Sequence, residues 1–513
     1  MKRIIKYISI ILISLFIFSL NISADSSINL EKLDNIKEYK TLDEFLSDYN
    51  SNSLPDVYIT NFLFDGVSSV KTPDLDDFIE NDSNDTKIKT LDIKVININT
   101  TGNITLTGKI KGAMIGVNTN NKKGDINIIL NNVNIDTDSK KAPGIYVYNK
   151  DKNYTEAKVT IKTLDGTKNY IEGGKLKKVS LIGKDELDKY SSYYSDDALT
   201  NYNKYSSYYG IYTSEEINNI LFAVVQADNE DLKDGEPYYT YKASGAISSD
   251  IDLYFEGLGY LKVTSKNKEG IETKGNLTFS GGSGDYEIYS YDDCLNTTTS
   301  STINKNARND LTINVNSLYA YVNQESDEGD AIDSNGKLII NGGTIYAFAH
   351  PSSMDAGLDS GNGTYINSGV VISTGNMADN ISSDSKQNYL YASFNGINKD
   401  SLIIIEDEKG NLITAFKTLR NIKTLLYSSP DLKYKSYKIY VGGDIDGEET
   451  NGLYTKINNY TKGEEISFNI INNNEKISNN ISNTILKVLL IEIGVLILFL
   501  LIIYFTNKKR LTN

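Results

Sequence analysis

Hydrophobic and polar residues alternate through most of the middle of the chain. The segment 91–98 reads Leu-Asp-Ile-Lys-Val-Ile-Asn-Ile, and the alternation resumes over 103–106 after a glycine. A period of two predicts strands with one buried face, and the Gly and Asn residues between the segments predict tight turns. The same alternation returns at 402–405 and 437–441, which predicts a C-terminal β cap over residues 381–471.

Two segments depart from this pattern. Apolar residues near the N-terminus recur at helical spacing and predict one amphipathic helix within an N-terminal helical and β cap over residues 25–85: Leu30, Leu33, Ile36, Tyr39, Phe45, Leu46 and Tyr49. Residues 190–212 are rich in Tyr, Ser and Asp and contain too few aliphatic residues to form a core. We expect this segment to be a long inserted loop.

An internal repeat organises the centre of the chain. Its first part is an apolar, polar, hydroxyl triplet that occurs five times: Ile247-Ser248-Ser249, Ile271-Glu272-Thr273, Leu295-Asn296-Thr297, Ile332-Asp333-Ser334 and Leu358-Asp359-Ser360. The first residues of the triplets are spaced 24, 24, 37 and 26 apart, and the long spacing contains an insertion from Thr298 to Asn309. A small residue precedes each triplet, and a second short strand ending in a turn follows it.

A repeat of this length, built from strands and turns without room for a helix, is typical of stacked β coils. We therefore predict an all-β fold, a right-handed parallel β-helix over residues 86–380 with inserted loops. The alternative is a pair of sandwich domains, whose antiparallel strands need no fixed period.

The two ends of the chain carry long apolar segments. Lys2, Arg3 and Lys6 precede an apolar stretch, and a small-residue cleavage site follows it, which predicts a signal peptide over residues 1–24. The alternative is an uncleaved anchor helix. Residues 485–507 are long and apolar enough for a transmembrane helix, after a polar stalk at 472–484 and before a basic tail at 508–513. The positive-inside rule then predicts a single-pass protein of the cell membrane with its N-terminal part outside.

Charge and residue usage exclude several classes of function. The net charge is −15, so the chain lacks the basic patch that nucleic-acid binding requires. Cys294 is the single cysteine and His350 the single histidine, which excludes an intramolecular disulfide and the usual zinc sites. No P-loop or serine-hydrolase motif is present.

Acidic residues recur beside the triplets. We expect stacking to bring them together, because neighbouring strands lie about 4.8 Å apart, and like charges at that distance repel unless a cation bridges them. Calcium accepts six to eight oxygen ligands in loose geometry, so calcium is the predicted cofactor. The alternative is that these residues are ordinary turn residues that bind only solvent. The candidate metal ligands are Asp292, Asp293, Asp327, Asp330, Asp333, Asp355 and Asp359.

Aromatic residues near the triplets are candidates for sugar contacts: Tyr286, Tyr289, Tyr291 and Tyr346. Each is individually more typical of a core or strand-surface position than of a ligand platform. An acidic protein can hold a polyuronate only through bridging metal ions, so calcium and glycan binding are expected to be coupled.

The repeat segments 269–282 and 329–344 resemble bacterial carbohydrate-binding domain-containing proteins of the β-helix type, and the similarity extends over about residues 90–445. The resemblance implies a secreted right-handed parallel β-helix, pectate-lyase-like in shape, that binds calcium and polygalacturonate without established cleavage activity. Cys294 stands where a Gly or Ala is usual, and the C-terminal apolar segment is absent from many members.

Three functions remain open from the sequence. The first is a cell-surface, non-enzymatic protein that retains an acidic polysaccharide through calcium. The second is a surface adhesin or structural protein without glycan binding. The third is a polysaccharide lyase, for which Lys274 and Arg308 are the candidate bases between residues 245 and 375.

Overall fold

A computed structural model of the chain describes residues 26–61, 93–177, 242–298 and 308–471, with gaps of one to six residues inside these ranges. The predicted signal peptide, the whole insertion at 190–212, the polar stalk, the transmembrane helix and the basic tail lie outside the described residues. Among the described residues, no helix is long and apolar enough to cross a membrane.

The smaller of two large sheets carries the triplets. Its ten strands follow one another in chain order: β2 (Lys37–Glu38), β3 (Val57–Thr60), β4 (Lys94–Ile98), β6 (Ala113–Asn118), β8 (Ile145–Tyr148), β13 (Ile247–Ser249), β16 (Ile271–Thr273), β19 (Leu295–Thr297), β21 (Ile332–Ser334) and β23 (Leu358–Ser360). All neighbours pair in parallel except β3 and β4.

The larger sheet has sixteen strands. Its main path is β17 (Leu277–Phe279), β14 (Leu253–Gly257), β9 (Glu156–Thr163), β7 (Lys123–Asp136), β10 (Lys168–Gly173), β15 (Tyr260–Ser265), β18 (Asp285–Ser290), β20 (Leu311–Val322), β22 (Leu338–Phe348), β25 (Val370–Gly375), β29 (Ile422–Ser428), β26 (Tyr389–Ile397) and β32 (Asn469–Ile471). Three further strands pair beside this path: β1 (Ser26–Asn29), β5 (Gly102–Lys111) and β24 (Thr364–Ile366). A short separate pair is formed by β11 (Leu176–Lys177) and β12 (Lys242–Ala243).

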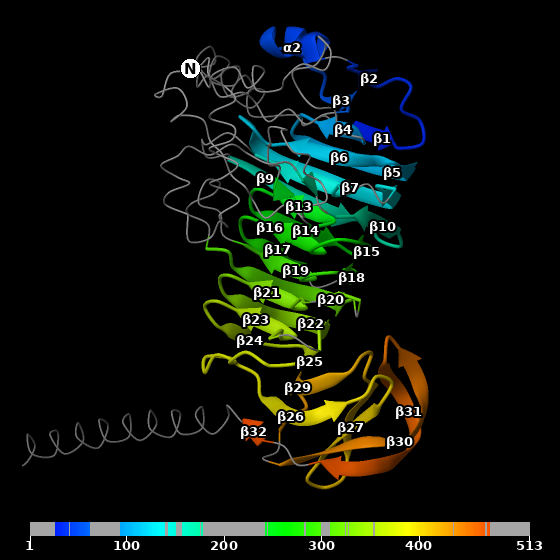
Figure 1. Ribbon diagram of the computed structural model, residues 1–513, viewed down its shortest axis with the longest axis vertical. Coiled ribbons are helices and arrows are strands. Elements are labelled where there is room, and N and C mark those ends of the chain that lie inside the picture. Colours follow the sequence, from blue (N-terminus) through cyan, green and yellow to red (C-terminus); the bar gives the residue numbers. More distant parts are fainter. Residues whose placement is uncertain are drawn as a thin grey trace, which may run out of the picture.

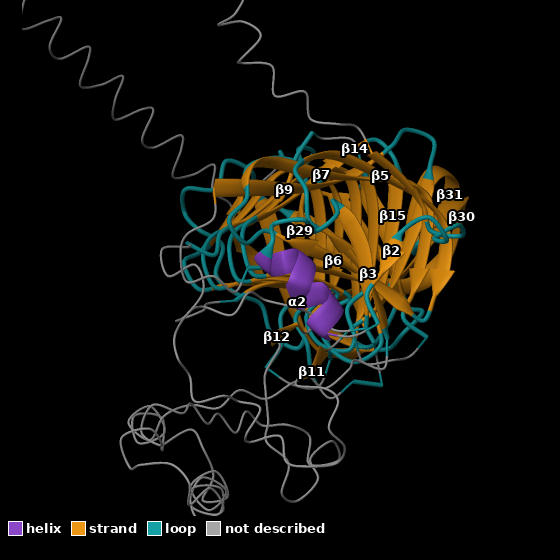
Figure 2. Ribbon diagram, turned by 90° about the horizontal axis from the view of Figure 1, so that it is seen from above, coloured by secondary structure: helices purple, strands orange, loops and turns teal. Residues whose placement is uncertain are grey.

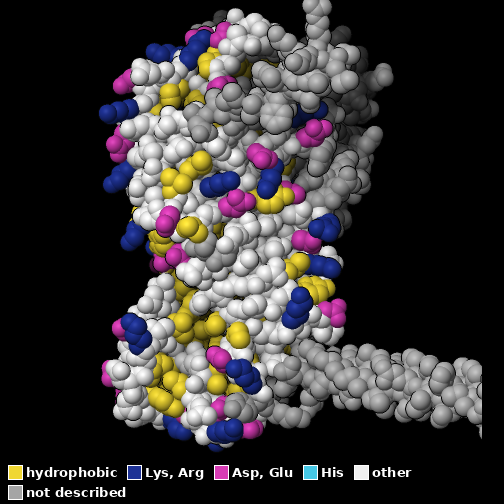
Figure 3. Space-filling view, turned by 180° about the vertical axis from the view of Figure 1, so that it is seen from behind, with side chains coloured by type: hydrophobic (Ala, Val, Ile, Leu, Met, Phe, Trp, Pro, Cys, Tyr) yellow, Lys and Arg dark blue, Asp and Glu magenta, His cyan; other side chains and the backbone are white. Residues whose placement is uncertain are grey.

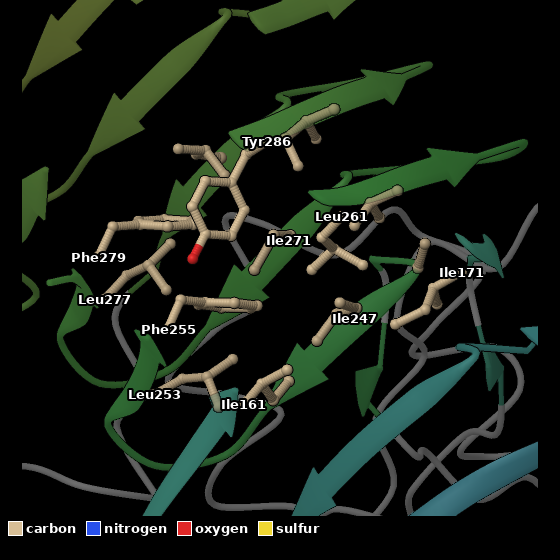
Figure 4. Close-up of a cluster of buried hydrophobic side chains, with 14 of the residues drawn as sticks. Ile161, Ile171, Ile247, Leu253, Phe255, Leu261, Ile271, Leu277, Phe279 and Tyr286 are labelled. Atoms are coloured by element: carbon tan, nitrogen blue, oxygen red, sulfur yellow. The ribbon is translucent and has the colours of Figure 1, made fainter. Parts of the chain in front are cut away.

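The two large sheets enclose one hydrophobic core. Inward side chains alternate with outward ones along each strand, so a single continuous cluster collects residues of both sheets from Ile28 to Leu426. Phe255 and Phe279 stack inside it with ring centroids 4.7 Å apart, and the ring of Tyr286 lies nearly perpendicular to both, at 88° and 79° (Figure 4). Seen along the long axis, the strands surround this interior (Figure 2).

One short helix covers the N-terminal end of the sheets. Helix α2 (Leu42–Asn50) lies across that end (Figures 1 and 2), where Phe45 packs against the rings of Tyr39 and Tyr58. The helix is shorter than the pattern predicts, because residues 30–36 form turns and irregular backbone and residues 37–38 form strand β2. Turns and one short strand thus replace helical hydrogen bonding in the first half of this segment.

The C-terminal strands form a closed antiparallel barrel. It consists of β27 (Leu402–Asp407), β28 (Leu412–Lys417), β31 (Leu453–Ile466) and β30 (Tyr437–Thr450). A second core joins the barrel to the outward face of the larger sheet, with Tyr319, Tyr346 and Phe348 on one side and Ile403, Phe416 and Ile439 on the other. In Figure 1 the barrel occupies the lower end of the molecule.

The predicted fold class is correct as all-β and wrong in its architecture. In place of a right-handed parallel β-helix with a separate β cap, the described strands form large parallel sheets that close around one core like a barrel. The transmembrane helix of the same prediction lies outside the described residues. At β25 the pairing changes to antiparallel, so strands β29, β26 and β32 continue the larger sheet instead of forming a separate cap. The surface seen from behind carries interspersed basic and acidic side chains (Figure 3).

Candidate functional site

The five triplets lie side by side on neighbouring strands. Ile247, Ile271, Leu295, Ile332 and Leu358 are register partners in turn from β13 to β23. These first residues are buried in the common core, so the middle residues project from the other face of the sheet. The middle residues form a polar ladder, here named the triplet row: Ser248, Glu272, Asn296, Asp333 and Asp359.

A second row of carboxylates runs parallel to the first. It lies two residues before the triplets of β16, β19 and β21 and consists of Glu269, Asp293 and Asp330, here named the turn row. Backbone hydrogen bonds link its members, since the Gly270 amide donates to the Asp293 carbonyl and the Cys294 amide donates to the Asp330 carbonyl. The two rows together place acidic side chains along one border of the smaller sheet.

Three carboxylates converge where the two rows meet. The carboxylate oxygens of Asp330, Asp333 and Asp359 lie within 4.8 Å of one another, and all three side chains are half-buried. Two oxygens that share a calcium ion at about 2.3 to 2.6 Å can be separated by up to about 5 Å. The described residues therefore fit a site for a hard cation, with an all-oxygen donor set.

Burial and mutual repulsion make these carboxyl groups hard to ionise. The pKa of Asp330 is raised to about 8, first by burial and then by the charges of Asp359, Asp333 and Asp355. The pKa of Asp333 is raised to about 7 by burial and by the charges of Asp359 and Asp292. Burial also raises the pKa of Asp359, together with the charge of Asp379. A bound cation would remove this repulsion and favour the ionised forms.

Asp293 has a different role in the structure. Its Oδ1 accepts a hydrogen bond of 2.8 Å from the Asp330 amide, and its Oδ2 accepts one from the Asn296 side chain. Burial, followed by the charge of Asp292, raises its pKa well above the ordinary value. Asp330 repeats the motif one strand later, since its Oδ1 accepts a bond of 2.5 Å from the Ala356 amide. Both side chains thus fix the spacing of the turns that carry the site.

The remaining predicted metal ligands lie beside the cluster. Asp292 forms an ion pair of 2.7 Å with Lys268. The Oδ2 of Asp355 accepts a hydrogen bond of 3.0 Å from the Gly329 amide. Asp327 lies outside the described residues. Of the seven predicted ligands, the structure brings Asp330, Asp333 and Asp359 together and gives the other described ones hydrogen-bonded or paired positions around them.

Two carboxylates of the rows were not among the predicted ligands. Burial and the charge of Glu272 raise the pKa of Glu269 to about 8. Glu272 is buried and forms an ion pair with Lys274, while its Oε2 has no hydrogen-bond partner among the described residues. The sequence could have predicted that Glu272 belongs to the acidic row, because it is the middle residue of its triplet, like Asp333 and Asp359. Both candidate bases of a lyase are thus ion-paired in the structure. Lys274 is buried beside Glu272, and Arg308 pairs with Asp310 at 3.3 Å.

The predicted sugar-contacting tyrosines divide between two environments. Tyr286 points into the core of the two sheets (Figure 4), and Tyr346 is buried against the C-terminal strands. Tyr289 and Tyr291 are half-buried, and the Lys262 ammonium lies 4.4 Å from the centroid of the Tyr289 ring. Alternation places Tyr286 and Tyr289 on opposite faces of β18, so of these two only Tyr289 can contact a ligand.

Comparison with known proteins identifies one family. A family described as carbohydrate-binding domain-containing protein matches residues 92–201 and 211–424, which is more than half of the 513 residues. The match includes the strands that carry both carboxylate rows. No curated protein and no solved structure matches the chain.

Proposed function

Because the chain belongs to the family of carbohydrate-binding domain-containing proteins, we propose that it retains an acidic polysaccharide of the polyuronate type through calcium held by Asp330, Asp333 and Asp359. The convergence of these three carboxylates on neighbouring strands is the observation that carries the proposal. Carbohydrate binding as such follows from the family. The uronate and the cation are what the geometry supports in addition.

The cation and the ligand are chosen by electrostatics. The chain has a net charge of −15, and its three convergent carboxylates repel any second anion. A calcium ion has room for six to eight oxygen ligands, so three monodentate aspartates leave positions for sugar carboxylates and hydroxyls. A polyuronate can complete the calcium shell, whereas a neutral glycan offers only hydroxyl oxygens there. Calcium and polyuronate therefore bind in a coupled way.

The place of action is part of the same proposal. An export signal at residues 1–24 and a membrane span at 485–507 would present the sheets outside the cell. Extracellular calcium would then be available to the site. Both segments lie outside the described residues, so this part of the proposal comes from the sequence pattern alone.

Binding of de-esterified and methyl-esterified polygalacturonate tests the proposed function. Affinity electrophoresis of the full-length chain should show calcium-dependent retardation by the de-esterified polymer and little by the ester, since esterification removes the sugar carboxylates. The Asp330→Asn/Asp333→Asn variant should lose this retardation, and Asp165→Asn, an exposed turn residue, should keep it. Equal retardation by both polymers, or retardation in chelator, would contradict the calcium bridge. Unsaturated, ultraviolet-absorbing products would instead indicate a lyase.

A further inference from the structure

A second group of polar and aromatic side chains lies on the other large sheet. It projects from the outward face of β10, β15 and β18 and reaches the tip of the barrel. We name it the tyrosine face, and it consists of Tyr170, Tyr260, Lys262, Glu287, Tyr289 and Asn451. None of these residues belongs to either carboxylate row, so the tyrosine face is separate from the calcium site.

The tyrosine face is built around two neighbouring rings. The Tyr170 and Tyr260 ring centroids lie 6.0 Å apart at an interplanar angle of 64°, and Tyr170 is 40% exposed while Tyr260 is half-buried. An exposed tyrosine presents an apolar ring surface and a hydroxyl that can donate or accept. Such surfaces suit ligands that alternate C–H groups with hydroxyls.

Hydrogen-bonding groups border the rings on the side of the barrel. The Lys262 ammonium lies 3.7 Å from the Glu287 carboxylate and 4.4 Å from the Tyr289 ring centroid. The Asn451 side chain, at the turn between β30 and β31, donates to the same carboxylate at 3.4 Å. Lys262 and Glu287 remain 35% and 20% exposed, so both can still exchange hydrogen bonds with a ligand.

Charge decides which ligand suits this face. Lys262 is paired with Glu287, and Lys266 next to the face is paired with Glu172. Lys168 and Asp285, the register partners of Tyr260 on the two neighbouring strands, add one charge of each sign. The local charges therefore cancel, and nothing here attracts a polyanion as a cation in the carboxylate cluster would. The exposed ring of Tyr170 and the half-buried ring of Tyr260, beside a balanced pair of donor and acceptor groups, favour an uncharged, hydroxyl-rich ligand.

We propose that the tyrosine face binds an uncharged segment of a glycan chain, independently of calcium. The inference rests on the carbohydrate-binding function of the family, and it adds a second site with a different ligand class. The rings of Tyr170 and Tyr260 contact the C–H faces of the sugar. Lys262, Glu287 and Asn451 hydrogen-bond to its hydroxyls. A chain with both neutral and uronate segments can then engage both sheets, which increases the avidity of the protein for such polymers.

Binding of galactomannan and hydroxyethylcellulose in chelator tests the proposal. We expect the full-length chain to be retarded by at least one of these neutral polymers, and the Tyr170→Ala/Tyr260→Ala variant to bind it at least about tenfold more weakly. Tyr365→Ala is the matched control. Tyr365 is a half-buried tyrosine on β24, outside the tyrosine face, and its ring centroid lies 5.2 Å from the Lys337 ammonium.

The two sites fail in distinguishable ways. The Asp330→Asn/Asp333→Asn variant should lose calcium-dependent uronate binding and keep neutral-polymer binding, and the tyrosine variant should show the reverse. No retardation by either neutral polymer would overturn the tyrosine-face proposal and leave the calcium site standing. Equal retardation of the wild type and Tyr170→Ala/Tyr260→Ala would overturn it too, and thermal melting of the double variant would verify that it is folded.

Discussion

Asp333 on β21 is the direct register partner of Asp359 on β23, so parallel pairing places two carboxylates on adjacent strands of one sheet. Asp330 in the preceding turn adds a third, and the three side chains share one patch within 4.8 Å. Without a cation, this patch is a local source of instability, because like charges opposite each other in a sheet repel. The cluster therefore links the stability of the fold to whatever ion it binds.

Calcium should stabilise the protein against heat. A ligand that binds only the folded state at 100 times its Kd adds about 2.7 kcal/mol, so millimolar calcium should raise the melting temperature measured in chelator. In the Asp330→Asn/Asp333→Asn variant the rise should disappear. Circular dichroism melting curves with chelator and with calcium measure both effects.

Asp165→Asn provides the control for this comparison, since Asp165 is exposed and lies in the turn after β9. It should show the same calcium-induced shift as the wild type. Identical melting curves of the wild type in chelator and in calcium would contradict calcium binding at Asp330, Asp333 and Asp359.

Stability in chelator should fall as pH rises. The pKa values of Asp330 and Asp333 are about 8 and about 7 in the folded chain, against an ordinary value of 3.8. Between about pH 4 and about pH 8 the folded state thus holds protons that the unfolded state has released, and stability decreases over that window. Urea unfolding at about pH 5 and about pH 8 measures the decrease.

The double asparagine variant should flatten this pH dependence, because its amides do not titrate. Calcium affinity of the wild type should increase over the same window, as the metal competes with protons for the carboxylates. A wild-type urea midpoint that rises from pH 5 to pH 8 in chelator would contradict the pKa directions on which this prediction rests.

The spacing of the triplets predicted which residues stack. Short strands that recur in one sheet must pair with the preceding copy, and the register from Ile247 to Leu358 follows this rule across the insertion at 298–309. The C-terminal barrel could not be predicted in the same way. Its pairing joins residues such as Ile403 and Val441, which have no repeat to align them and meet only through long-range antiparallel contacts.

The site was predictable where the repeat fixed the geometry. Asp333 and Asp359 occupy the same triplet position, so their proximity follows from the alignment alone. The repeat did not predict which tyrosine side chains face the core. Alternation along the strand places Tyr286 and Tyr289 on opposite faces but does not say which of the two is buried. Pairing of Tyr286 with the inward Leu261 decides it. The tyrosine face depends on Tyr170 and Asn451, which are 281 residues apart and come together only in the folded chain.

Phe255→Ala should strongly destabilise the paired sheets. The ring is fully buried and stacks on Phe279 at an interplanar angle of 12°, so truncation leaves a cavity between neighbouring strands. Removal of a buried phenylalanine ring costs about 3–5 kcal/mol. Urea unfolding measures the loss, and Tyr170→Ala, at an exposed position, should stay within about 0.5 kcal/mol of the wild type. A Phe255→Ala variant of wild-type stability would show that the core closes around the cavity.

Arg420→Ala should loosen the C-terminal strands from the parallel sheets. The Arg420 Nη1 donates hydrogen bonds of 2.6 Å to the Val322 carbonyl and 3.0 Å to the Ala349 carbonyl, and the guanidinium lies 5.4 Å from the centroid of the Tyr321 ring. Since hydrogen bonds to charged groups contribute about 1.5–3 kcal/mol each, loss of both should reduce stability by about 3 kcal/mol.

Hydrogen exchange locates this effect. Amides of β26 and β29 should exchange faster in Arg420→Ala, while those of β4 and β6, at the end of the molecule opposite the barrel (Figure 1), should keep wild-type rates. Lys423→Ala removes an exposed cation from β29 itself and should change neither set. Arg420→Lys retains the charge with a single ammonium in place of the forked guanidinium. Its exchange rates in β26 and β29 should therefore lie between those of the wild type and those of Arg420→Ala. Uniformly faster exchange over all strands would mean that Arg420 stabilises the whole fold rather than the junction, because local loosening leaves the distant strands protected.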